Sequence, residues 1–133
     1  MRKTILDTDY AGITYDSGLK MGKIEWKRKT TTEEYRHSFM VLLEFAKDNP
    51  ADNFLSDTTN QGVVSPENRK WFETEMLPQA IEIGLKRAGV IFDGNVFKKY
   101  YLNMIIKVSN KFGVPIRLFN SEEEAILWFK DSE

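Results

Sequence analysis

Residues 54–62, which read Phe54-Leu55-Ser56-Asp57-Thr58-Thr59-Asn60-Gln61-Gly62, contain the change of pattern that decides the fold. The stretch begins as a short apolar strand and continues as a polar turn. Ser65 and Pro66 then predict a helix, because serine caps helices and proline fits the first helical position. In an open α/β sheet, ligands and partners bind at the carboxyl ends of parallel strands. We therefore look for a functional site first at this turn.

The segments before this stretch predict a hairpin and a helix. Residues 13–16 and 21–28 form the two strands, and Ser17-Gly18 provides the turn between them. The basic run at residues 27–29 is expected to be a solvated strand end. Thr31 and Glu34 make a capping-box pattern for a helix that ends before Pro50.

The segments after the stretch alternate between helices and strands. The helix that begins at Ser65 contains Pro78, which predicts a kink near Leu77 or two consecutive helices. A strand at residues 90–93, a helix at 96–112, a strand at 114–119 and a helix capped by Ser121 follow.

The order β-β-α-β-α-β-α-β-α predicts an α/β fold, because right-handed crossovers between successive strands require a largely parallel sheet. We expect one domain over residues 1–133. Its mixed, mostly parallel sheet should have about five strands and about four helices, with an antiparallel N-terminal hairpin.

The composition argues against several classes of function. The net charge of -1 provides no positive field to hold nucleic acid. The absence of cysteine removes thiol chemistry and disulfides and fits a reducing compartment. No apolar run approaches the ~20 residues of a membrane span, and Asp7 and Asp9 interrupt any signal peptide. We expect a cytoplasmic protein without cofactor or metal, and His37 is expected on a helix surface.

The order of elements and a set of scattered residues resemble the STAS domain family, the fold of bacterial anti-sigma-factor antagonists. The likeness is strongest to the branch grouped with CRAL-TRIO-type lipid-binding domains, and it covers residues 10–130. The matching residues are Leu55-Ser56-Asp57-Thr58, Trp71, Leu77-Pro78-Gln79-Ala80, Gly84-Leu85-Lys86-Arg87-Ala88, Phe119, Glu124-Ala125 and Trp128.

This resemblance implies a non-enzymatic regulatory or protein-interaction module. In the antagonists, a partner kinase phosphorylates a serine in the turn before the second helix, which switches protein binding. The corresponding turn here carries Asp57, Thr58, Thr59 and Asn60, so a threonine is the candidate phospho-acceptor. Hydrogen bonding within the turn is the alternative explanation of the same residues. The expected partner is a protein, and a homodimer is also open.

Two other functions stay open. Phe72, Met76, Pro78, Phe97, Tyr101 and Met104 could line an apolar pocket for a small apolar ligand or lipid, although their helical spacing also fits a plain core.

Asp57 and Asp93 both end predicted parallel strands and could form a carboxylate pair that binds Mg²⁺ or shares a proton. Asp57 followed by Thr59 is similar to the nucleophile turn of haloacid-dehalogenase-type phosphatases. This would make the protein a phosphate-handling enzyme.

Overall fold

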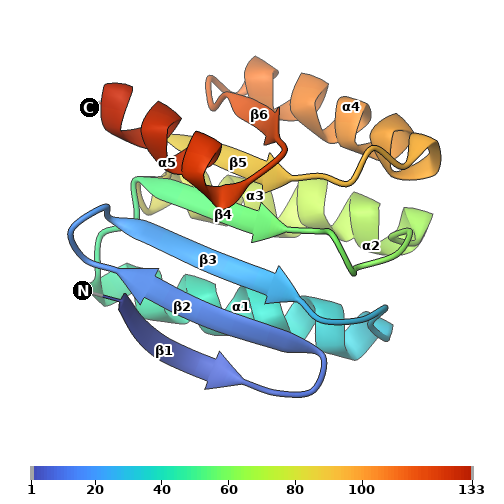
Figure 1. The fold of residues 1–133 in the computed structure, drawn as a ribbon, viewed down its shortest axis with the longest axis horizontal. Helices are drawn as coiled ribbons and strands as arrows, with labels where there is room; N and C mark the ends of the chain where they lie inside the picture. The colour runs from blue at the N-terminus through green and yellow to red at the C-terminus, as the bar shows by residue number, and fades with distance from the viewer. Residues whose placement is uncertain (1, 133) are drawn as a thin grey trace.

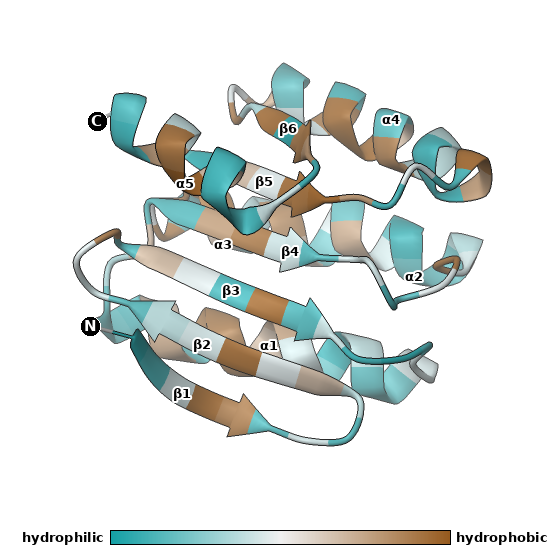
Figure 2. Cartoon of the chain, in the orientation of Figure 1, coloured by the Kyte–Doolittle hydropathy of each residue, from teal (hydrophilic) through white to brown (hydrophobic). Residues whose placement is uncertain are grey.

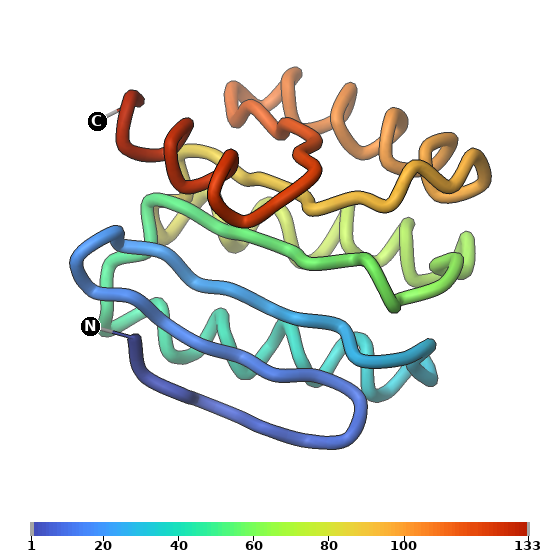
Figure 3. The backbone as a smooth tube through the Cα atoms, in the orientation of Figure 1, coloured from blue at the N-terminus to red at the C-terminus, as the bar shows by residue number. Residues whose placement is uncertain are grey.

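The computed structural model describes residues 2–132 and shows a mixed six-stranded sheet with helices on both faces (Figure 1). The strands lie in the sheet in the same order as in the chain, so the backbone advances steadily from one edge to the other (Figure 3). They are β1 (Arg2–Asp7), β2 (Ala11–Asp16), β3 (Met21–Trp26), β4 (Asn53–Asp57), β5 (Arg87–Ile91) and β6 (Ile116–Phe119).

The pairing confirms the predicted α/β class. β1, β2 and β3 pair antiparallel, whereas β3, β4, β5 and β6 pair parallel. The carboxyl ends of β3, β4 and β5 therefore share one edge, at the right of Figure 1. The loops that follow these three strands come together at that edge.

The sheet has six strands, one more than the five that the sequence predicted, and the additional strand is β1. β1 pairs with β2 at the sheet edge, and its register shifts between Thr4 and Leu6. Only Ile5 and Leu6 of this strand are half-buried, and the rest is exposed. An irregular edge strand does not show the alternation of apolar and polar residues that marks a half-buried strand. The sequence therefore did not predict β1.

Four helical segments connect or follow the parallel strands. Helices α1 to α4 lie behind the sheet in Figure 1, and α5 crosses the front, where it contacts β4, β5 and β6. Successive right-handed crossovers in one direction place their helices on the same face. The segments are α1 (Thr32–Asp48), α2 (Pro66–Trp71) with η1 (Phe72–Met76) and α3 (Leu77–Glu82), α4 (Val96–Lys111) and α5 (Glu122–Asp131).

Pro78 is accommodated by a π-helical turn, η1, between α2 and α3. Proline has no N–H, so it cannot donate to the carbonyl of Thr74 as an α-helix requires. The N–H of Leu77 donates instead to the carbonyl of Phe72, five residues back. The predicted break near Leu77 is therefore a change of helix type.

Each face of the sheet has its own apolar core. The larger core lies under α1, η1 and α4 and includes Ile24, Trp26 and Phe39. The smaller core lies under α5 and is made by Met21, Leu55, Ile91, Ala125 and Phe129. Figure 2 shows brown, hydrophobic segments along both the strands and the helices.

The packing of α1 on the sheet depends on Gly22 in β3. A Cβ at this position would lie 2.9 Å from Cδ1 of Leu42. Glycine therefore lets the helix approach the strand closely. None of the helices in residues 2–132 is long and apolar enough to cross a membrane.

Candidate functional site

The recognition turn, residues 57–62, lies at the carboxyl edge of the sheet between the end of β4 and helix α2. Asp57 holds the turn, because its Oδ1 accepts hydrogen bonds from the backbone N–H of Thr59 at 3.1 Å and from its Oγ1 at 2.7 Å. Thr59 and Asn60 are exposed. The local bonding that we weighed as an alternative is therefore present, and it leaves two polar side chains facing solvent.

Thr58 points inward, contrary to the expectation of an accessible phospho-acceptor. The residue is 3% exposed, and its Oγ1 donates to the carbonyl of Ile91 at 2.7 Å. The backbone N–H of Thr58 donates to the same carbonyl at 3.0 Å. Thr58 therefore extends the pairing of β4 with β5 and has a structural role. Thr59 is the threonine of this turn that a modifying enzyme can reach.

Lys98 is the residue of this region that the sequence analysis missed. Its side chain is 3% exposed, and its Nζ donates to the carbonyl of Thr58 at 2.7 Å and that of Thr59 at 3.4 Å. The same nitrogen pairs with Oδ2 of Asp93 at 3.1 Å. No local signal in the sequence marks Lys98, because helical spacing does not show which side of α4 is buried.

Asp57 and Asp93 each have their own partners at this edge. Asp57 bonds to Thr59, and Asp93 accepts from the N–H of Asn95 and from Lys98. The Asn95 N–H and the Lys98 ammonium hold the pKa of Asp93 below its ordinary value. Within residues 2–132, no group of three or more His, Asp or Glu side chains is placed to hold a metal ion. His37 is exposed, as expected.

The six residues predicted to line one apolar pocket do not come together. Phe72 and Met76 line one cavity of about 50 Å³ beneath α1, and Phe72 and Tyr101 line a second cavity of about 50 Å³. Pro78 lines neither cavity. Ligand pockets hold roughly 300–1,000 Å³, so these spaces are packing gaps by comparison.

Phe97 and Met104 instead lie on the outer side of α4. Phe97 is 71% exposed, Tyr100 is 70% exposed and Met104 is 37% exposed. These three residues, which we call the α4 stripe, follow each other at spacings of three and four and so share one side of the helix. Helix α4 therefore has an inner side, with Leu102 and Ile105 buried, and an outer side that carries the α4 stripe.

The recognition turn lies between helix α4 and an open cleft. On one side, Gln61 of the turn accepts a hydrogen bond from the hydroxyl of Tyr101 in α4 at 3.4 Å. On the other side, Gly62 has a φ of 78°, which favours glycine, and its Cβ position would lie 3.6 Å from Cβ of Lys29. The cleft, of about 420 Å³, is bordered by residues 29–32 and by residues 61 and 63–66.

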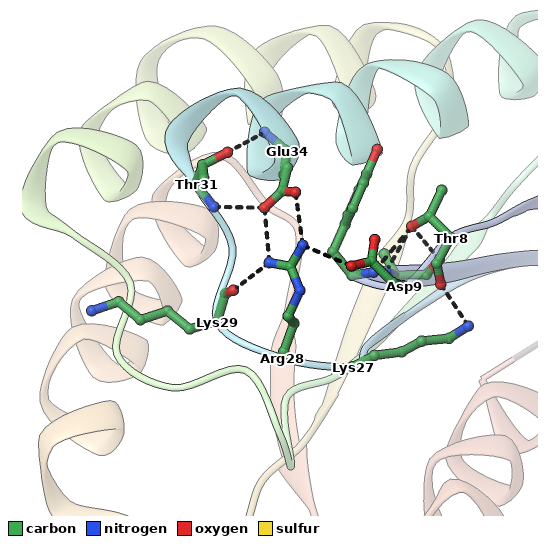
Figure 4. A network of polar contacts seen from close by, with 9 residues as sticks. Thr8, Asp9, Lys27, Arg28, Lys29, Thr31 and Glu34 are labelled. Carbon is green, nitrogen blue, oxygen red and sulfur yellow. Dashed lines mark hydrogen bonds and ion pairs between the residues drawn. The ribbon is translucent and has the colours of Figure 1, made fainter.

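The basic run at residues 27–29 belongs to a structural network at the same edge (Figure 4). Arg28 donates to Asp9 and Glu34, and Glu34 closes the capping box with Thr31. The Arg28 guanidinium and the Thr31 N–H lower the pKa of Glu34 to about 2. The run thus joins the β1–β2 loop to the start of α1.

We compared the chain with protein-family models, with curated proteins and with solved structures, and no match was found. The class that the fold and the site define is an α/β protein with an exposed aromatic stripe beside a polar turn.

Proposed function

We propose that this protein is a non-enzymatic, STAS-like protein-interaction module that binds a protein partner through the recognition turn and the α4 stripe. The observation that carries the proposal is the exposure of Phe97 and Tyr100, 71% and 70%, on the helix whose Lys98 and Tyr101 bond to the turn. Large apolar side chains gathered on a surface mark interaction sites, and aromatic residues are enriched where proteins meet.

The surface is held rigidly, which favours binding. Lys98 bonds to the carbonyls of Thr58 and Thr59, and Tyr101 bonds to Gln61, so three hydrogen bonds join the turn to α4. A surface that is ordered before binding loses less conformational entropy on association. Thr59 and Asn60 supply exposed polar groups on this turn, and polar residues form the rim of protein interfaces.

The STAS-like part of the proposal rests on the order of elements and on the position of the turn before the second helix. Within it, Thr59 is the phospho-acceptor, because it is exposed while Thr58 is buried. A phosphate there would add about -1.5 to -2 charges beside the carboxylate of Asp57. This would change which partner binds. A lipid-carrier function has less support, because the interior cavities are about 50 Å³ each.

The experiment is a quantitative affinity purification from the native cell with the Thr59→Glu and Phe97→Ser variants. We expect each variant to change the recovery of the same specific proteins about tenfold, as the loss of an interface hot spot does. Thr4→Glu on β1 and Leu127→Ser on α5 are the matched controls, because both residues are exposed away from the site. A partner set that is identical in all five proteins, wild type included, would contradict the proposal.

A further inference from the structure

The cleft beside the recognition turn is lined by three buried polar side chains. Its volume of about 420 Å³ lies within the range of ligand pockets, roughly 300–1,000 Å³. Tyr35, Gln61 and Asn68 all line it, and each is between 4% and 5% exposed. Buried polar groups in proteins are normally hydrogen-bonded, so the partners of these three residues carry information about what the cleft holds.

Each of the three side chains has a donor group without an acceptor among residues 2–132. The hydroxyl of Tyr35 makes no hydrogen bond in this part of the chain. Gln61 uses its Oε1 to accept from the hydroxyl of Tyr101 at 3.4 Å. Asn68 uses its Oδ1 to accept from Nε of Arg36 at 3.4 Å. The amide nitrogens of Gln61 and Asn68 therefore have no protein acceptor in the described residues.

These donor groups touch solvent-accessible space. In the described part of the chain, the only side-chain nitrogen or oxygen that is sealed from solvent without a hydrogen bond is Oε1 of Glu73. Tyr35 and Gln61 line both the cleft and the inner cavity of about 50 Å³, whereas Asn68 lines the cleft alone. The cleft is thus the larger space that all three donors share.

The rest of the lining favours negative charge. Among the described residues that line the cleft, Lys29 is the only charged one, and it makes no ion pair within residues 2–132. Figure 4 shows its side chain directed away from the network of Arg28 and Glu34. Thr32, the first residue of α1, also lines the cleft. The N–H groups at the start of a helix carry partial positive charge.

The hydroxyl of Tyr35 is a fixed, neutral donor. Burial, with a smaller effect of Tyr101, raises the pKa of Tyr35 above its ordinary value, so the hydroxyl keeps its proton. The ring stacks on Trp26 at a centroid distance of 5.4 Å and meets the edge of Phe39 at 5.0 Å. A donor that is held in place before binding loses little conformational entropy when a ligand arrives.

We propose that this cleft binds a small organic anion, whose carboxylate or phosphate group accepts hydrogen bonds from Tyr35, Gln61 and Asn68. Hydrogen bonds to an ionised acceptor are stronger than those between neutral groups. The ammonium group of Lys29 and the start of α1 favour the charge of this ligand. Val63, in the same lining, is 48% exposed and offers contact to an apolar part of the molecule.

The first test is an NMR titration of the isotope-labelled chain with phenyl phosphate, benzoate and neutral benzamide. We expect both anions to bind with a Kd of about 1 mM or tighter and to shift the side-chain amide signals of Gln61 and Asn68. Tighter binding of phenyl phosphate would assign the site to phosphates, and tighter binding of benzoate would assign it to carboxylates. Binding of neither anion, or equal binding of benzamide, would overturn the inference and leave water as the partner of these donors.

The second test removes the donors one at a time. Tyr35→Phe loses only the hydroxyl and should weaken anion binding about tenfold, as the loss of a hydrogen bond to a charged group does. Asn68→Asp keeps an acceptor for Arg36 but turns a negative oxygen toward the anion, so it should weaken binding at least as much. Tyr10→Phe, at a half-buried tyrosine outside the cleft, should leave the Kd unchanged. Equal Kd values for Tyr35→Phe and the wild type would overturn the inference.

The third test addresses the charge of the site. Lys29→Met should weaken anion binding about threefold, because an exposed ion pair contributes less than a buried hydrogen bond. Lys130→Met, at an exposed lysine of α5, is the matched control and should have no effect. The amide spectrum of each variant without ligand shows whether the fold is kept. Equal effects of the two lysine variants would contradict the role of Lys29.

This inference does not rest on the proposed function, because Phe97 and Tyr100 lie outside the lining of the cleft. Tyr35→Phe should reduce anion binding and leave the recovery of partner proteins unchanged. Phe97→Ser should have the opposite pattern of effects. Loss of anion binding in Phe97→Ser would show that the anion binds on α4 and would overturn its placement in the cleft.

Discussion

The ammonium group of Lys98 donates a hydrogen bond to the backbone carbonyl of Thr58 at 2.7 Å, and this contact joins helix α4 to the turn after β4. A buried charge is stable only when its bonding capacity is used. Here two carbonyls and the carboxylate of Asp93 surround the nitrogen. The position of the α4 stripe relative to the recognition turn depends on this lysine.

Replacing Lys98 with methionine should destabilise the protein by about 2 kcal/mol, the range for a hydrogen bond to a charged group. Methionine is one atom shorter than lysine and has no N–H, so the Thr58 carbonyl and Oδ2 of Asp93 lose their donor. Urea denaturation would measure the change in the free energy of unfolding. Lys99→Met, at the exposed neighbour, should stay within about 0.5 kcal/mol of the wild type. Equal effects at both positions would show that the buried contact is not what stabilises the turn.

Replacing Thr58 with valine tests whether this residue is structural. The substitution keeps the shape and removes the hydroxyl that donates to the Ile91 carbonyl at 2.7 Å. We expect a loss of about 1 kcal/mol in the free energy of unfolding. Thr58→Ser keeps the hydroxyl and should recover part of the loss. If valine is tolerated without any loss, the β4–β5 connection does not depend on this hydrogen bond.

The stability of the protein at acidic pH should depend on Glu34. Its hydrogen bonds with Arg28 and Thr31 lower its pKa from 4.5 to about 2 in the folded protein. Because the folded-state pKa lies below the ordinary one, this carboxylate stabilises the fold above pH 4.5, and the contribution is lost as the pH falls toward 2.

Glu34→Gln should therefore reduce the dependence of the melting temperature on pH in this window. The matched control is Glu33→Gln, at the exposed neighbour in the same first turn of α1. Melting curves recorded by circular dichroism would check both variants. Identical pH profiles for Glu34→Gln and the wild type would refute the role assigned to the network in Figure 4.

Gly22→Ala should destabilise the protein by about 1–3 kcal/mol, as overpacking of a core does. The new methyl group would lie 2.9 Å from Cδ1 of Leu42, so either the Leu42 side chain or α1 itself must shift. Gly12→Ala in β2 is the control, because the nearest atom would be 3.6 Å away. Thermal unfolding would compare the two variants. A Gly22→Ala protein as stable as the control would mean that Leu42 repacks freely.

Local sequence signals predicted the elements well because they act over one helical turn or one strand. Thr31 caps α1 with the full capping box, and Ser65 and Ser121 cap α2 and α5. The strand predicted at residues 21–28 is present as β3, in which Ile24 and Trp26 are buried and Glu25 is exposed. Pro78 correctly marked a break near Leu77, although its form, a π-helical turn, depends on which hydrogen bonds the neighbouring residues make.

The sequence predicted where the candidate site lies in the sheet, but not the contacts that each of its residues makes. The turn lies at the carboxyl edge of the sheet, as the order of strands and helices required. The sequence left open which threonine of the turn is accessible, and Thr58 is buried by its bond to Ile91, which lies 33 residues later in the chain. Neither this contact nor the bond of Lys98 to the turn leaves a trace in local periodicity.

The sequence by itself determined the α/β class, the order of the elements and the helix starts, because capping, proline geometry and apolar spacing act between near neighbours. Only the tertiary structure decided which side of α4 faces the sheet. Periodicity shows which residues share one side of a helix, but the position of that helix on the sheet decides which side is buried. For this reason Phe97 and Met104, predicted inside, lie outside with Tyr100, while Lys98 lies beneath them.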